Sequence, residues 1–153
     1  MKKNLLLLLM LCIAMIAGAQ EDDDPVVVRD VAVTLQKAGT LDSVLSDMSP
    51  ETITGLKITG DINGSDIFAL RELCTHHFYE EDDALLHKLD LTDARIVAGG
   101  ESYYDDIDYG GDGSSKFTED DVVGELMFYQ CSLLDTLLLP RNVKAVGKGA
   151  FQD

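Results

Sequence analysis

The chain has 153 residues, and its 12 lysine and arginine residues are outnumbered by 28 aspartate and glutamate residues, which gives a formal net charge of −16. A surface this acidic repels phosphate backbones and anionic lipid headgroups. The composition therefore argues against nucleic-acid binding and against attachment to a membrane surface.

Residues 1–19 have the features of a secretory signal peptide. Lys2 and Lys3 give a basic start, residues 5–16 form an unbroken apolar run, and residues 17–19 form an A-x-A cleavage site. An apolar run of this length is too short to cross a bilayer. We expect cleavage after Ala19, an acidic disordered leader over residues 20–25, and a mature chain that is secreted or held at the cell surface.

Four short runs of alternating or continuous apolar residues predict four strands in the mature chain. They are residues 33–35, 56–58, 89–91 and 137–139. The segments between them are helix-like or irregular, and strand and excursion recurring every few tens of residues are typical of a solenoid. We therefore predict an α/β repeat fold, a solenoid of short parallel strands with helical or irregular excursions, stacked in that order.

Two of the excursions carry helix-start signals. Thr40 is placed to cap a short helical turn that begins at Leu41. Ser65 is placed to cap a longer helix from Asp66 to about Cys74.

Alternation along the strands predicts which side chains enter the core and which stay outside, since successive residues of a strand point to opposite faces. The inward set is aliphatic and consists of Val33, Leu35, Leu56, Ile58, Leu89, Leu91, Leu137 and Leu139. The outward set forms an exposed sheet face and consists of Gly55, Lys57, Thr59, Lys88, Asp90, Thr92, Thr136, Leu138 and Pro140. If the second and third strands are neighbours, Lys57 and Asp90 lie side by side.

A longer repeat is visible near the end of the chain. Val123, Gly124 and Phe128 each return at the same offset in sequence, as Val146, Gly147 and Phe151, with the last predicted strand between them. Three matches in one register are more than chance supplies, so the two segments are interpreted as successive repeats.

This repeat resembles that of the BspA-like leucine-rich-repeat proteins, which are bacterial surface and secreted proteins. The matching positions are Val123-Gly124, Met127-Phe128, Cys131, Leu134, Leu137, Leu139-Pro140, Val143, Val146-Gly147 and Ala150-Phe151. Met127 stands where alanine is usual, and valine replaces isoleucine before each glycine. Residues 26–100 are similar to the N-terminal capping region of the same family. The resemblance implies a leucine-rich-repeat solenoid that binds host extracellular-matrix proteins or other cells.

Residues 101–121 separate this capping region from the repeat at 122–153 and are rich in acids. Asp106, Asp108 and Asp112, among glycines, have the composition of a calcium loop. Glycine and phenylalanine occupy positions where an EF-hand needs oxygen ligands, so we interpret the segment as a solvated, mobile acidic loop rather than as a calcium site.

The cluster Cys74, His76, His77, Glu80 and His87 contains residue types that bind zinc. It lacks an H-E-x-x-H or a paired C-x-x-C pattern, and helix capping and charge balance explain its histidines equally well. We therefore favour no metal and no cofactor at this cluster.

The two cysteines of the mature chain leave two alternatives open. Cys74 and Cys131 either form a disulfide, which export permits, or stay as small buried thiols, which the sequence favours.

Three functions remain, and the sequence ranks them. The first is a protein-binding or adhesion module whose ligand contacts the acidic loop or the outward residues Lys57, Thr59, Lys88, Asp90, Thr92, Thr136 and Leu138. The second is a structural cap truncated from a longer solenoid, and the third is a metal-dependent hydrolase built on His76, His77 and Glu80. No catalytic motif is present, so we expect no enzyme. An uncovered last strand also predicts self-association through residues 134–151.

Overall fold

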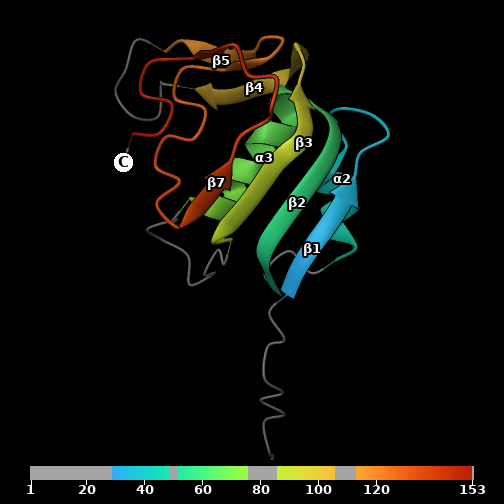
Figure 1. Ribbon diagram of the computed structural model, residues 1–153. Helices are drawn as coiled ribbons and strands as arrows, with labels where there is room; N and C mark the ends of the chain where they lie inside the picture. The colour runs from blue at the N-terminus through green and yellow to red at the C-terminus, as the bar shows by residue number, and fades with distance from the viewer. Residues whose placement is uncertain (1–28, 49–51, 76–85, 106–112, 153) are drawn as a thin grey trace, which may run out of the picture.

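The protein is described by a computed structural model that covers residues 29–48, 52–75, 86–105 and 113–152. Its main element is a four-stranded parallel sheet in the order β1 (Arg29–Thr34), β2 (Ile53–Ile62), β3 (Lys88–Ile96) and β7 (Thr136–Leu138) (Figure 1). The predicted parallel pairing and strand order are confirmed. The fold class is α/β, with mostly parallel strands in one sheet and few helices. The predicted signal peptide and leader, residues 1–25, lie outside the described residues.

Two helices connect the first three strands. Helix α2 (Leu41–Ser46) follows β1, and α3 (Gly64–Cys74) follows β2 and lies against one face of the sheet (Figure 1). No helix in the described part of the chain has the length and apolar character needed to span a membrane.

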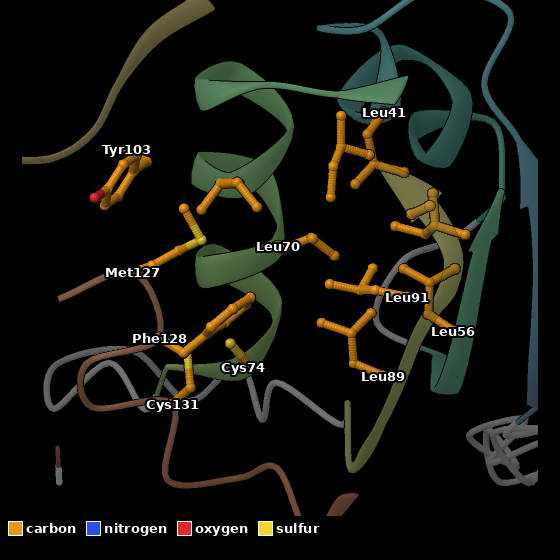
Figure 2. Close-up of a cluster of buried hydrophobic side chains, with 14 of the residues drawn as sticks. Leu41, Leu56, Leu70, Cys74, Leu89, Leu91, Tyr103, Met127, Phe128 and Cys131 are labelled. Atoms are coloured by element: carbon orange, nitrogen blue, oxygen red, sulfur yellow. The ribbon is translucent and has the colours of Figure 1, made fainter. Parts of the chain in front are cut away.

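The core lies between the sheet and α3. Leu56, Leu89 and Leu91 point from the sheet toward Leu70 of the helix (Figure 2). Six of the eight predicted inward residues are buried, namely Val33, Leu35, Leu56, Ile58, Leu89 and Leu91. Leu137 and Leu139 are only half-buried, because β7 is the edge strand and has a neighbour on one side alone.

Within β3, alternation is interrupted by a bulge. A second register shift lies at the start of the β1–β2 pairing, between Arg29 and Asp30. Lys57 pairs with Asp90, but two residues later Thr59 pairs with Asp93, so β3 carries one extra residue at this point. The backbone N–H of Thr92 donates to Oδ1 of Asp90 at 2.9 Å and stabilises the bulge. Because of the bulge, Ala94 and Ile96 continue the buried row that Leu89 and Leu91 begin.

The segment predicted as an acidic loop, residues 101–121, is structured at both of its described ends, which corrects that prediction. These ends contribute to β4 (Gly99–Asp105) and form β5 (Ser115–Thr118), and the two strands pair antiparallel past the end of β3 (Figure 1). The segment is ordered because two of its aromatic side chains, Tyr103 and Tyr104, are buried in the hydrophobic core. The calcium candidates Asp106, Asp108 and Asp112 lie outside the described residues.

The two C-terminal segments that share the Val, Gly and Phe pattern lie against each other. β6 (Val122–Val123) pairs in parallel with β8 (Ala145–Val146), which places Val123 opposite Val146. The rings of Phe128 and Phe151 are stacked with centroids 6.0 Å apart and planes 3° from parallel. A side chain at Gly147 would meet the Gly124 carbonyl carbon at 2.7 Å, so this stacking requires glycine there.

The start of both helices depends on one buried carboxylate, that of Asp66 in the first turn of α3. Its Oδ2 accepts the backbone N–H groups of Gly39 at 2.6 Å and Asn63 at 2.9 Å, and its Oδ1 accepts that of Leu41 at 2.9 Å. Asn63, rather than the predicted Ser65, is the N-cap of α3 and completes a capping box with Asp66.

Thr40 is the N-cap residue of α2, as predicted, but its hydroxyl does not cap the helix. The hydroxyl donates to the carbonyl of Lys37 at 2.8 Å, and the Asp66 carboxylate accepts the Leu41 N–H instead. One acidic side chain therefore satisfies backbone N–H groups at the beginnings of two helices, although Leu41 and Asp66 are 25 residues apart in the chain.

Replacing Asp66 tests this arrangement. We expect Asp66→Asn to lower the free energy of unfolding by about 3 kcal/mol, because the amide NH₂ would face backbone N–H donors in a site closed to water. Asp42→Asn is the matched control, since Asp42 lies exposed in the first turn of α2 and should cost less than about 1 kcal/mol. Denaturant midpoints measure both, and equal midpoints for the two variants would contradict the role given to Asp66.

Candidate functional site

Among the described residues, no helix covers one face of the sheet, and we call this face the outer face. It is the side of the four-stranded sheet opposite α3 (Figure 1). Strand register arranges its residues in four rows: Asp30, Gly55, Lys88 and Thr136; Ala32, Lys57, Asp90 and Leu138; Thr34, Thr59 and Asp93; and Asp61 with Arg95. Rows of this kind present side chains from several strands to a single partner.

The structure brings six of the seven predicted site residues into these rows, namely Lys57, Thr59, Lys88, Asp90, Thr136 and Leu138. Lys88, Thr136 and Leu138 are exposed, and the others are half-buried. Thr92 lies half-buried within the β3 bulge, and Asp93 takes the position opposite Thr59.

Two other residues assigned to the exposed face are buried. Gly55 is covered because the carboxylate of its β1 neighbour Asp30 lies over it, where a side chain would collide with Asp30 Oδ1. Pro140 is buried because β7 ends at Leu138 and the chain then turns, with the Val143 N–H donating to the Pro140 carbonyl, so strand alternation no longer applies.

A chain of ion pairs crosses the outer face. Lys57 Nζ is 2.7 Å from Asp93 Oδ2 and 3.8 Å from Asp90 Oδ2, and Arg141 Nη2 is 3.6 Å from Asp93 Oδ1. Lys57 and Asp90 lie side by side as predicted. The shorter contact, however, is with Asp93, because the bulge turns that residue outward.

These contacts shift the acid–base behaviour of the face. The hydrogen bond and charge of Lys57 hold the pKa of Asp93 below its ordinary value, and the same contact raises the pKa of Lys57. The pKa of Asp90 is lowered chiefly by its hydrogen bonds to Thr92. All three groups are therefore charged at neutral pH, and each side chain is partly exposed to solvent, where ion pairs contribute little to stability.

A small hollow of about 110 Å³ opens in the outer face beside this network. Its lining residues are Asp30, Val31, Gly55, Leu56, Lys57, Lys88 and Asp90. The lining of the hollow therefore combines acidic, basic and apolar residues.

The charge of the outer face differs from that of the whole chain. Among the described residues, the four rows hold four acids, Asp30, Asp61, Asp90 and Asp93, and three bases, Lys57, Lys88 and Arg95. Arg141, which follows β7, adds a fourth base through its contact with Asp93. The chain carries a net charge of −16. Other proteins, many of them acidic, are thus repelled less by this face than by the average surface of the molecule.

The described residues of the predicted zinc cluster, Cys74 and His87, lie in different surroundings. Cys74 is buried in the core, whereas His87 is exposed, with Nδ1 3.1 Å from the Leu133 carbonyl and 3.5 Å from Asp135 Oδ2. His76, His77 and Glu80 lie outside the described residues. Within residues 29–48, 52–75, 86–105 and 113–152, no group of three or more histidine, cysteine, aspartate or glutamate residues is placed to hold a metal ion.

The last row of the outer face continues into a buried acidic anchor, Asp121. Its carboxylate accepts hydrogen bonds from Lys144 Nζ at 2.6 Å, from Arg95 Nε at 3.2 Å and from the Asn142 amide. Its backbone N–H donates to the Ile96 carbonyl at 2.9 Å. Asp121 therefore joins β3 to the segment at residues 142–144, and the hydrogen bonds from Lys144 and Arg95 lower its pKa.

Sequence reasoning missed Asp93, Arg95 and Asp121 as site residues. Asp121 is the last of three consecutive acids, and nothing in that run distinguishes it from Glu119 and Asp120. Its φ of 62° comes from the tertiary turn. Asp93 could have been found only by knowing that β3 carries a bulge.

No protein-family model matches the chain, and no curated protein matches it in sequence.

The lowered pKa of Asp121 predicts a pH dependence of stability. A carboxyl whose folded pKa lies below its unfolded pKa contributes stability at neutral pH and loses it as pH falls through about 4 and below. We expect Asp121→Asn to be less stable than the parent at pH 7 and to approach it at pH 3. Glu119→Gln, an exposed neighbour, is the control for general charge effects. Urea unfolding at both pH values measures the difference in the free energy of unfolding between the parent and Asp121→Asn. A difference that stays constant with pH would contradict a stabilising role of the ionised Asp121 carboxylate.

Proposed function

We propose that the chain is a secreted or cell-surface protein-binding module, built as a leucine-rich-repeat solenoid, whose outer sheet face holds a protein ligand. The observation that carries this proposal is the outer face itself. No described helix covers it, and its rows together with Arg141 hold four acids and four bases on a strongly acidic chain. The apolar side chain of Leu138 is exposed at its edge.

The chemistry of the face favours a protein over a small molecule. Its polar groups are spread over four rows, and its hollow of about 110 Å³ is too small to enclose a typical small-molecule ligand. Alternating charges beside an apolar side chain match the mixture of polar rim and apolar contact found in protein interfaces.

Two features support the solenoid part of the proposal. The two copies of the C-terminal repeat stack in parallel register, with Val123 opposite Val146 and Phe128 stacked on Phe151. The strands of the main sheet are also in sequence order, as expected when each strand and excursion adds one layer beside the last. The secreted location rests on the signal-like sequence of residues 1–19.

Binding to a panel of purified extracellular-matrix proteins and to intact bacterial cells tests the ligand face. The variant Lys57→Gln, Lys88→Gln, Leu138→Ser removes two cations and one apolar group from the rows. We expect it to weaken binding about tenfold or more, since a few central residues carry most of an interface's affinity. Its melting temperature should change little, because exposed ion pairs stabilise by only about 0–1 kcal/mol.

A matched triple variant controls for lost charge and lost apolar surface. Lys37→Gln, Lys148→Gln, Phe68→Ser removes the same kinds of group at exposed positions that belong neither to the four rows nor to the acidic segment 101–121. It should bind like the parent. Equal weakening by both triple variants, or by neither, would remove the outer face as the ligand site.

A second function, self-association, is favoured by the apolar groups near the edge of the sheet. β7 is an edge strand, and Leu138, Val146 and Phe151 are 43%, 53% and 48% exposed. An apolar edge is a template for the addition of another strand. A second copy of the chain would supply one.

Sedimentation at low and moderate ionic strength measures this association. Salt screens the repulsion between two acidic chains, so we expect the parent to associate more at moderate salt. Leu138→Lys places a charge on the edge strand and should keep the chain monomeric under both conditions. Parent chains that stay monomeric at both salt concentrations would rule out this second function.

A further inference from the structure

Two buried thiols meet where α3 ends against the repeat that contains Phe128. Cys74 is the last residue of α3, and Cys131 follows Phe128 by three positions. Their side chains point toward one another (Figure 2), and both are reduced thiols with exposed fractions of 0% and 7%. The two positions are far apart in the sequence, so the fold alone brings them together.

The surroundings of the pair argue against two other roles, that of a reactive nucleophile and that of a metal-binding pair. The two thiols are hydrogen-bonded to each other, and that bond together with burial raises the pKa of Cys74 above its ordinary value. Neither thiol therefore acts as an exposed nucleophile. Among the described residues, the pair also lacks a third ligand that a metal ion would need.

A second contact keeps the two cysteines in place before any bond forms. Arg71 stands three residues before Cys74, on the same side of α3. Its Nη1 donates to the carbonyls of Leu126, Met127 and Tyr129, each at 3.1 Å. These hydrogen bonds hold α3 and the turn before Cys131 together, one helical turn from the thiols. A disulfide between Cys74 and Cys131 would therefore order little additional chain.

We propose that Cys74 and Cys131 form an intramolecular disulfide when the chain matures in an oxidising compartment, and that this bond links α3 covalently to the C-terminal repeat. The presence of the bond in cells rests on the export that the proposed function includes. The capacity of the chain to form the bond as it folds rests on the fold, which places the two side chains together.

The chemistry is thiol–disulfide exchange with a small disulfide oxidant such as oxidised glutathione. One cysteine thiolate attacks a glutathione sulfur, the S–S bond of the oxidant breaks, and one reduced glutathione leaves. The second cysteine thiolate then attacks the protein sulfur of the mixed disulfide and releases the second reduced glutathione. The cysteine pair loses two electrons and two protons in total; the oxidant gains the electrons, and the two glutathione thiolates take up protons from solvent.

The timing of the bond follows from burial. Thiolates form readily in the unfolded or partly folded chain and poorly in the closed core, so oxidation accompanies folding rather than following it. A bond between positions this far apart in sequence restricts the unfolded chain strongly. The melting temperature of the bridged form should exceed that of the reduced form by on the order of 10 °C.

The full chain with Cys12→Ser provides the test, because this change removes the only other cysteine. The protein is unfolded with reductant and refolded in a mixture of reduced and oxidised glutathione. We expect a mass loss equal to two hydrogen atoms, a proteolytic peptide that joins Cys74 to Cys131, and the higher melting temperature. Variants that add Cys74→Ala or Cys131→Ala are the controls, since neither can bridge and either one suffices if the other fails to fold.

Refolded protein whose two thiols remain reduced, or that carries glutathione without an internal bridge, would overturn the proposal. A bridge that leaves the melting temperature unchanged would do the same. This refolding test does not require secretion, so its failure is separate from failure of the proposed function. Absence of the chain from secreted and surface fractions would refute export and leave the refolding result standing.

Discussion

The buried guanidinium of Arg71 is the contact on which the arrangement of the C-terminal half depends. One of its nitrogens donates to three backbone carbonyls in the turn at residues 126–130, and its Cζ lies over the Tyr104 ring, 4.9 Å from the centroid. The turn contains left-handed residues at Leu126 and Gln130, with φ of 56° and 58°. Its Leu126 carbonyl also accepts the Tyr129 N–H at 3.1 Å, and Arg71 supplies a donor to the Met127 and Tyr129 carbonyls. A buried cation is tolerated only when its donors are satisfied, so helix and turn each complete what the other lacks.

Helix α3 holds segments at both of its ends in place, because a charged side chain near each end faces the interior and bonds to backbone groups of another segment. Asp66 accepts three backbone N–H groups at its beginning, and Arg71 donates to three carbonyls nearer its end. Both groups are buried and hydrogen-bonded to backbone, and hydrogen bonds that involve an ionised group are the stronger ones. Strands β2 and β3 pack against the apolar side of α3. Their side chains that point away from α3 form part of the outer face.

The charges of the outer face have a different physical role. Lys57, Asp90 and Asp93 are paired in solvent, where their attraction is small and their loss would leave the fold intact. Charges that do little for stability remain available for a ligand. Together with the hollow beside Gly55, they distinguish this face from the acidic remainder of the molecule and support the proposed role in protein recognition.

Local sequence patterns predicted the strands of the main sheet, but they did not predict the β3 bulge or the long-range hydrogen bonds. Alternation at residues 33–35, 56–58 and 89–91 was enough to place strands, their order and their buried sides, because a strand with one apolar face has a single register that buries it. Packing in three dimensions settled the bulge that exposes Asp93, the burial of Tyr103 and Tyr104 in an acidic segment, and the partners of Asp66, Arg71 and Asp121. Those partners lie 21 to 58 residues away in the chain, apart from the N-cap Asn63 beside Asp66. Hydrogen bonds across such separations are set by how helices and strands pack, and no periodicity in the sequence records them.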